Sequence, residues 1–118
     1  MLLVEDESQV RHAARRILEG AGYTVLEASS GAEALAMTRE HTSDIHLLLT
    51  DMVMPAMGGH ELSEQFLTLR PGAVTAFMSG YTEDAVLRRV VFAPGTVFIE
   101  KPFTPEALTR KVRQAMAA

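Results

Sequence analysis

The sequence predicts a doubly wound α/β fold: a (βα)5 three-layer sandwich whose parallel sheet, of strand order 2-1-3-4-5, lies between two layers of helices. Three observations support this prediction. Short apolar runs alternate about five times with stretches of helical periodicity. Short loops join these segments, as in βαβ units. The chain of 118 residues, 47% hydrophobic and 22% charged, has the size and composition of one ordinary globular domain, which we expect to span residues 1–118.

The expected strands are the short apolar runs. The first run ends abruptly at the acidic residues Glu5, Asp6 and Glu7. The third run is apolar on both faces except at His46, which is typical of a central strand in a parallel sheet. The five strands are expected at residues 1–4, 23–27, 45–50, 73–78 and 96–100.

The first two expected helices follow the first two strands. Apolar residues at the spacing i, i+3, i+4, i+7, i+8 predict the first helix, which Gly20 and Gly22 end. Ser30 and Glu33 have the spacing of a capping box and open the second helix. The residues expected to face inward are Val10, Ala13, Ala14, Ile17 and Leu18 in the first helix, and Leu35 and Ala36 in the second.

Three further helices complete the expected alternation. The third begins near Glu61 and halts before Pro71. Thr82 is the expected N-cap of a short fourth helix. Thr104 as N-cap and Pro105 at the first helical position begin the last helix. The inward residues are expected to be Leu62, Phe66 and Leu69 in the third helix, Val86 and Val90 in the fourth, and Leu108, Val112 and Ala115 in the last.

Charge and composition exclude several classes of protein. The net charge of −4 argues against a general nucleic-acid binder, so we expect no direct binding of nucleic acid. Apolar runs are far shorter than the roughly 20 residues of a membrane helix, and acidic residues from Glu5 onward do not fit a signal peptide. We therefore expect no membrane insertion by this domain. The absence of cysteine excludes a disulfide framework and suits the reducing cytoplasm, where we expect the protein.

Polar side chains that could take part in catalysis or ligand binding follow four of the expected strands. Glu5 and Asp6 follow the first strand, Asp51 the third, Ser79 the fourth and Lys101 the fifth. In open parallel sheets, ligands bind outside the carboxyl ends of the strands, at the point where the strand order reverses. With the order 2-1-3-4-5, these four strands stand side by side, so the side chains can meet at one edge.

Such a cluster fits phosphoryl transfer. Neighbouring carboxylates repel one another, and Mg²⁺ relieves that repulsion by taking one or two carboxylates together with waters and phosphate oxygens. A carboxylate such as Asp51 can attack phosphorus to give an aspartyl phosphate. This reaction needs mainly alignment and neutralisation of charge on the equatorial oxygens, which Mg²⁺, Lys101 and the Ser79 hydroxyl could supply.

The same residues lie in four segments that resemble the receiver domains of bacterial two-component response regulators. The resemblance extends along essentially the whole chain, and it is specific because all four segments occur in order, each at the end of an expected strand. The segments are Leu3-Val4-Glu5-Asp6-Glu7, Thr50-Asp51-Met52-Val53-Met54-Pro55 with Met57 and Gly59 beyond, Met78-Ser79-Gly80, and Lys101-Pro102-Phe103.

The resemblance implies a flavodoxin-like fold and a set of metal ligands. Asp51 matches the phosphoacceptor of the family. Glu5 and Asp6 match the acidic pair that holds Mg²⁺ together with Asp51 and the backbone carbonyl of Val53, with Mn²⁺ able to substitute. Glu5 departs from the more usual Asp at its position, a variation expected to leave metal binding intact.

The resemblance also implies the residues that act on the phosphoryl group and report its presence. Ser79 matches the hydroxyl residue that moves toward a phosphoryl oxygen, and Lys101 matches the family's lysine, with a typically cis bond to Pro102. Phe98 occupies the switch-aromatic position but lacks the hydroxyl of the Tyr often found there, which puts a hydrogen-bonded switch in doubt. Judged by composition alone, a residue such as Phe98 is more often a core residue than a switch.

Partners are implied by the same family. A histidine kinase or a histidine phosphotransfer protein would supply the phosphoryl group from a phosphohistidine. The face of the fourth helix, fifth strand and fifth helix would report the state, and could form a homodimer. The first expected strand begins at the first residue, which hints at a domain excised from a longer chain. The sequence of residues 98–113 resembles receivers attached to the C-terminal end of hybrid sensor histidine kinases, although a stand-alone regulator also fits.

Two other functions use the same residues. A hydrolase with an aspartyl-phosphate intermediate would normally carry a second Asp two residues after its nucleophile, where Val53 stands, and no loop is long enough for a cap. A degenerate receiver that only docks would not need the complete set of the acidic pair, Asp51, Ser79 and Lys101.

By family geometry, Val53 and Tyr81 flank the line of attack by water and should influence the lifetime of the phosphoryl group. The four histidines, His12, His41, His46 and His60, have no metal-ligand spacing.

Overall fold

The computed structural model describes residues 1–80 and 96–117. The helix expected after Thr82, with Val86 and Val90, lies outside these residues, as does Tyr81. The strands are β1 (Leu2–Val4), β2 (Leu26–Ala28), β3 (Leu47–Asp51), β4 (Val74–Ser79) and β5 (Val97–Glu100). The helices are α1 (Ser8–Gly20), α2 (Gly31–Glu40), α3 (Gly59–Leu69) and α5 (Pro105–Ala117).

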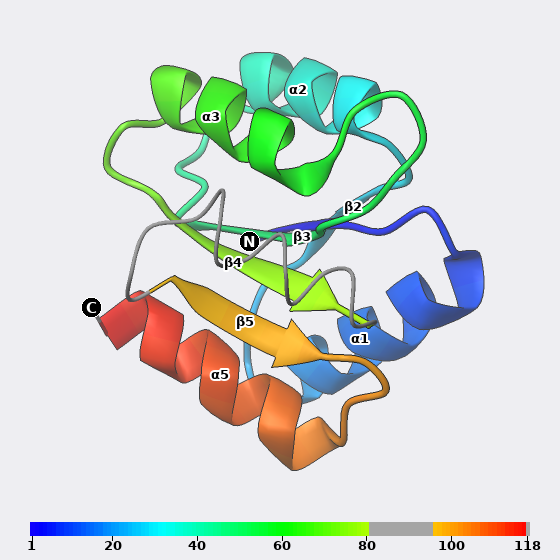
Figure 1. The fold of residues 1–118 in the computed structure, drawn as a ribbon. Coiled ribbons are helices and arrows are strands. Elements are labelled where there is room, and N and C mark those ends of the chain that lie inside the picture. Colours follow the sequence, from blue (N-terminus) through cyan, green and yellow to red (C-terminus); the bar gives the residue numbers. More distant parts are fainter. Residues whose placement is uncertain (81–95, 118) are drawn as a thin grey trace.

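The five strands form one parallel sheet of order β2-β1-β3-β4-β5, which confirms the predicted topology. Helices α2 and α3 cover one face of the sheet, and α1 and α5 cover the other (Figure 1). The arrowheads of β4 and β5 point to the same edge of the sheet, as parallel pairing requires (Figure 1). The fold is therefore the flavodoxin-like doubly wound sandwich.

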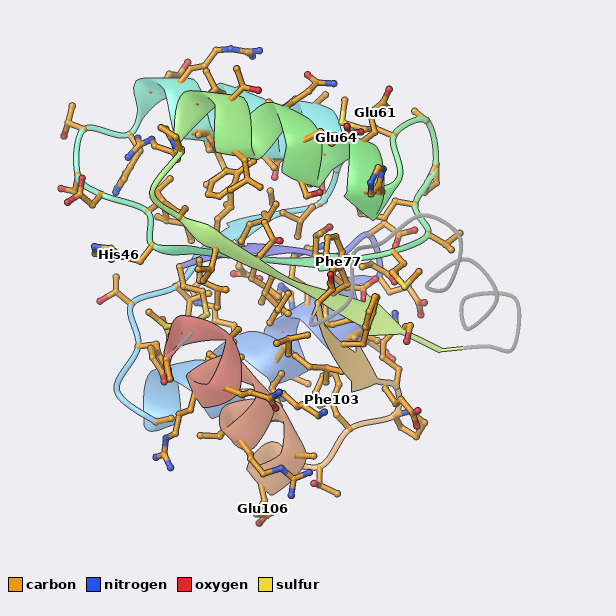
Figure 2. All side chains as sticks on the ribbon, turned by 60° about the vertical axis from the view of Figure 1, so that its left-hand side comes forward. His46, Glu61, Glu64, Phe77, Phe103 and Glu106 are labelled. Carbon is orange, nitrogen blue, oxygen red and sulfur yellow. The ribbon has the colours of Figure 1, made fainter. Side chains whose placement is uncertain are left out.

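Two hydrophobic cores lie on the two faces of the sheet. Along β3, Leu47 and Leu49 belong to the core beneath α1 and α5, whereas Leu48 belongs to the core beneath α2 and α3. This division follows from the two-residue period of a strand, which sends successive side chains to opposite faces. Figure 2 shows side chains filling both layers between sheet and helices.

The inward faces of α1 and α5 agree with the periodicity. Ala14 and Leu18 are buried in α1, and Leu108, Val112 and Ala115 are buried in α5. The expected N-caps at Thr104 and Ser30, the two that lie within the described residues, also form. The Thr104 hydroxyl accepts a hydrogen bond from the Ala107 N–H, and the Ser30 hydroxyl accepts one from the Glu33 N–H. The Glu33 carboxylate accepts from Ser29 rather than from the cap residue itself.

Three predictions about element details were wrong. Ala36 is exposed because α2 buries Ala34, Leu35 and Thr38, and a residue 100° further round the helix faces solvent. Leu69, in the last turn of α3, is 39% exposed. The second strand lies at residues 26–28 rather than 23–27, because its partner β1 begins at Leu2, which is paired with Leu26.

Candidate functional site

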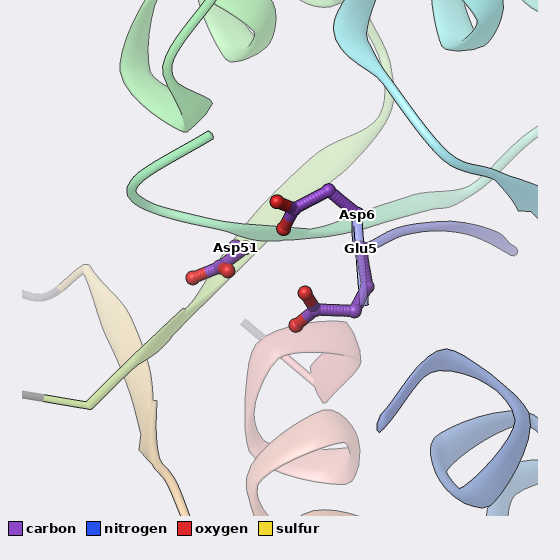
Figure 3. A group of neighbouring side chains, drawn as sticks. All are labelled: Glu5, Asp6 and Asp51. Carbon is purple, nitrogen blue, oxygen red and sulfur yellow. The ribbon is translucent and has the colours of Figure 1, made fainter. Parts of the chain in front are cut away.

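Three carboxylates meet at the carboxyl edge of the sheet. Glu5 and Asp6 follow β1, and Asp51 ends the adjacent strand β3, where Val4 is paired with Thr50. One oxygen from each carboxylate lies within 4.8 Å of the others, and Figure 3 shows the side chains of Glu5 and Asp6 extending toward the side where Asp51 lies. Asp6 is exposed, whereas Glu5 is fully buried and Asp51 is 6% exposed. Within the described part of the chain, this acidic cluster is the group that could hold a metal ion.

Lys101 joins the cluster from the end of β5. Its Nζ donates hydrogen bonds to Glu5 Oε1 at 2.9 Å and to Asp51 Oδ2 at 3.1 Å. The backbone N–H of Lys101 donates to the carbonyl of Ser79 at 2.8 Å, which fixes the start of the segment that carries the ammonium. The Lys101–Pro102 peptide bond is cis, as expected. One ammonium group therefore bridges two of the three carboxylates.

Ser79 is the last residue of β4 and is 2% exposed. Its Oγ has no hydrogen-bond partner among the described residues. Leaving a buried hydroxyl without a partner costs about 1–3 kcal/mol, so such a group calls for an explanation. An incoming oxygen-rich ligand at this edge of the sheet could provide the missing partner.

Val53 and Phe98 lie close to the cluster in sequence but serve different surroundings. The Val53 side chain is 59% exposed, at the rim of the site. Phe98, in β5, is half-buried, and its ring centroid lies 5.9 Å from that of Phe77. This contact gives Phe98 a packing role in the structure, and its role as a switch stays a prediction.

Burial dominates the electrostatics of the acidic cluster. Removal from water raises the pKa of Glu5 to about 7, although the hydrogen bond from Lys101 opposes the shift. Burial also raises the pKa of Asp51, against hydrogen bonds from Lys101 and from the backbone of Val53. Burial lowers the pKa of Lys101, but its bonds to Glu5 and Asp51 outweigh this effect and leave the pKa above its ordinary value. The cluster is thus short of positive charge, which a divalent cation would supply.

A cleft of about 830 Å³ opens beside the cluster. Asp6, Asp51 and Lys101 line it together with apolar side chains. An approaching donor group can therefore reach the carboxylate of Asp51 from solvent. The apolar lining comes from Val10, Ala13, Val53, Pro102 and Phe103.

The histidines lie away from this chemistry. His12 is 3.7 Å from Glu27, and His60 is 3.3 Å from Glu64 in the next turn of α3. His46 precedes β3 and points outward, with its side chain 72% exposed (Figure 2). Among the described residues, no group of metal-type ligands includes a histidine.

Gly59 allows the start of α3 to approach the end of β3. A Cβ atom at this position would lie 2.3 Å from the carbonyl oxygen of Asp51 and 3.1 Å from the Cα of Met52. Both atoms belong to the backbone, so neither can swing away. The Gly59 N–H donates to the carbonyl of Met52 at 2.9 Å, which holds the approach in place.

We therefore expect Gly59→Ala to displace the backbone of Asp51 and to lower the free energy of unfolding by about 1–3 kcal/mol, as overpacking typically does. Urea unfolding followed by circular dichroism measures this change. Gly72→Ala is the matched control, because a Cβ atom there meets nothing within 4 Å. Equal effects of the two substitutions would contradict the steric explanation.

The sequence reasoning missed Arg11. Its Nη1 donates to the backbone carbonyl of Glu5 at 2.8 Å, and its Nε donates to Glu27 Oε1 at 3.2 Å. A signal was present, because positions 11, 14 and 18 share one helix face, and Ala14 and Leu18 on that face are buried. A charged residue on the apolar face of a helix indicates a buried polar contact.

Comparisons with known proteins agree with this geometry. The family profile described as the response regulator receiver domain matches residues 1–113. The sensor kinase CckA of Brucella abortus is 38% identical over 116 residues, which are 98% of this chain and 12% of that protein. The receiver protein CpdR of the same organism is 30% identical, over all of this chain and 97% of its own length. The chain therefore belongs to the response regulator receiver domains of two-component signalling, in which phosphoryl transfer is the family's function.

Solved structures give the same result. The receiver domain of the hybrid histidine kinase CckA has a TM-score of 0.81 and 36% identity, covering 98% of this chain and 96% of that one. A response regulator receiver protein from Sinorhizobium medicae has a TM-score of 0.87 and 27% identity, covering 99% and 93%. Several matched relatives are much longer, and the chain spans only 12% to 48% of them. Within residues 1–80 and 96–117, the structure contains no helix of the length and apolarity that crossing a bilayer requires.

Proposed function

We propose that Asp51 is the phosphoacceptor of this receiver domain and that residues 1–118 form a single domain. Glu5, Asp6, Asp51 and the backbone carbonyl of Val53 would hold Mg²⁺, with Mn²⁺ able to substitute. The observation that carries the proposal is the ammonium of Lys101 bonded to both Glu5 and Asp51, within a cluster of three carboxylates. Hard oxygen ligands that together carry excess negative charge suit Mg²⁺.

The proposed reaction moves a phosphoryl group from a phosphohistidine to Asp51. An oxygen of the Asp51 carboxylate attacks phosphorus, a P–O bond forms, and the P–N bond to the imidazole of the partner breaks with its electron pair leaving on nitrogen. Lys101 already contacts the attacking carboxylate, so its ammonium is placed to neutralise an equatorial oxygen. The bound Mg²⁺ would neutralise further charge on the transferred group. Ser79 offers its unpartnered hydroxyl to another oxygen.

The same contacts suggest how phosphorylation would change the surface that partners bind. Ser79 and Lys101 end neighbouring strands, so a phosphoryl group that bonds to both would pull on β4 and β5. Phe98 lies within β5 and packs on Phe77 of β4, which would pass the change to the face that includes β5 and α5. That face would meet partners, among them a second copy of the chain.

The domain acts as a signalling module rather than on external substrates. We infer a histidine kinase or a histidine phosphotransfer protein as its partner, in the cytoplasm. The resemblance to the CckA receiver supports a position within a hybrid sensor kinase. The match to CpdR covers as much of this chain and nearly all of CpdR, which fits a stand-alone regulator equally well. A hydrolase is disfavoured, since Val53 holds the position of the general acid.

A direct test of the phosphoacceptor uses acetyl phosphate and Mg²⁺ followed by intact-protein mass spectrometry. We expect the mass of one phosphoryl group to be gained by the wild-type chain and lost entirely in Asp51→Asn. Asp44→Asn is the matched control, since this carboxylate lies in an exposed loop with its side chain 87% exposed. Phosphorylation that persists in Asp51→Asn would refute the assignment, and no gain in the wild type would leave docking as the function.

A further inference from the structure

Arg11 contacts the backbone of the acidic cluster and a neighbouring strand rather than the carboxylates of the cluster. Its side chain is 15% exposed, and its guanidinium links two separate segments: the carbonyl of Glu5 after β1 and the carboxylate of Glu27 in β2. The N–H of Glu5 donates to the carbonyl of Ala28, also in β2, at 3.2 Å. The backbone of Glu5 is thus tied to β2 on both sides, directly through its N–H and through Arg11 at its carbonyl.

The carbonyl that Arg11 holds belongs to the peptide unit between Glu5 and Asp6. Fixing this unit restrains the ψ angle of Glu5 and the φ angle of Asp6, and so the direction of both side chains. The Asp6 carboxylate is exposed, and no described residue donates a hydrogen bond to it. Its aim toward the cluster therefore depends on its backbone.

We propose that Arg11, held by Glu27, is a positioning residue that orients the Glu5–Asp6 pair for a divalent cation. This inference rests on the proposed metal site. Groups behind the ligands of a metal commonly tune affinity in this way, because they fix the ligands before the ion arrives.

A simple charge effect would have the opposite sign. A guanidinium near the site repels Mg²⁺, so removing its charge alone should strengthen binding of the ion. Removing a group that holds the ligands in place should weaken Mg²⁺ binding, since the ligands must then be ordered at the moment of binding. The direction of the change in affinity therefore separates the two roles.

The chain supplies two matched controls. Arg15 also pairs with Glu27 through its Nη1, but within the described residues its other hydrogen bond goes to Glu19 rather than to the acidic cluster. Arg70 resembles Arg11 in binding backbone carbonyls, those of Thr38, His41 and Ser43, at the other end of the molecule. Arg15 controls for charge and Arg70 for general stability.

The test measures Mg²⁺ affinity by isothermal titration calorimetry in Arg11→Met, Glu27→Gln, Arg15→Met and Arg70→Met. We expect Arg11→Met to weaken binding about 10-fold, the lower end of the effect of such supporting groups, and Glu27→Gln to weaken it less. Arg15→Met should leave affinity within about twofold, and Arg70→Met should lower the free energy of unfolding without changing affinity. Circular dichroism of each variant shows that it is folded, and Arg11→Gln, which likewise removes the guanidinium charge, carries the test should Arg11→Met not fold.

Two outcomes overturn the inference, and they can be told apart. Unchanged or tighter Mg²⁺ binding in a folded Arg11→Met or Arg11→Gln variant would overturn the positioning role while leaving the metal site intact. A wild-type chain that does not bind Mg²⁺ would overturn the metal site and the positioning role together.

Discussion

Replacing Lys101 by methionine is expected to slow phosphorylation of Asp51 by acetyl phosphate about 100- to 1,000-fold, the usual effect of removing one preorganised donor from a developing oxyanion. Lys101 Nζ lies 3.1 Å from Asp51 Oδ2, so its charge is already next to the oxygen pair that is proposed to receive the phosphoryl group. Methionine keeps an unbranched side chain of similar length without the charge. The rate is measured by mass spectrometry at saturating Mg²⁺.

The same substitution should not weaken Mg²⁺ binding. The ammonium of Lys101 occupies oxygens of Glu5 and Asp51 that a cation also needs, so its removal relieves a competitor. A slow reaction with undiminished Mg²⁺ affinity would separate charge neutralisation during the reaction from metal binding. Lys111→Met, which changes the only other lysine in the chain, is the matched control. A rate within about threefold of wild type in Lys101→Met would contradict the role argued for its charge.

Much of the site could be predicted because strand ends are a strong constraint. Glu5, Asp51 and Lys101 are far apart in the sequence, yet each follows a short apolar run, and parallel pairing brings the ends of such runs to one edge. The helix caps at Ser30 and Thr104 could also be predicted from the sequence, because their hydrogen bonds join residues that are close in the chain.

The rest depends on tertiary contacts that local patterns do not specify. Whether Ala34 or Ala36 faces the core depends on how α2 sits on the sheet, and both residues fit a helix equally well. The contact of Arg11 with Glu27 joins α1 to β2 across 16 positions of sequence. The close approach at Gly59 depends on backbone geometry that appears only once α3 packs next to β3.

The acidic cluster is also unfavourable to the fold in the absence of a cation, which makes stability depend on pH. The pKa of Glu5 is near 4.5 in an unfolded chain and about 7 in the folded protein. Between these values the folded state binds more protons than the unfolded state, so the free energy of unfolding falls as pH rises. Asp51, whose pKa is also raised by burial, adds a change in the same direction.

We therefore expect the metal-free protein to lose stability between about pH 4.5 and 7, by about 1.4 kcal/mol for each unit of pKa difference that is realised. Saturating Mg²⁺ should remove or reverse this loss, because at the proposed site the ion would bind the ionised carboxylates of the folded state. Urea unfolding at pH 5 and pH 7.5, with Mg²⁺ or with a chelator, measures both changes.

Glu5→Gln is the decisive control, since it keeps the shape of the side chain and removes its titration. This variant should show a smaller loss of stability between pH 5 and pH 7.5 and a weaker response to Mg²⁺. Glu27 does not interfere with this measurement. Burial would raise its pKa, but the hydrogen bond with Arg15 keeps that pKa below its ordinary value. Its contribution to the free energy of unfolding is therefore lost only as pH falls below about 4.5. If the metal-free wild type instead became more stable from pH 5 to pH 7.5, the raised pKa of buried Glu5 would not be what lowers the free energy of unfolding.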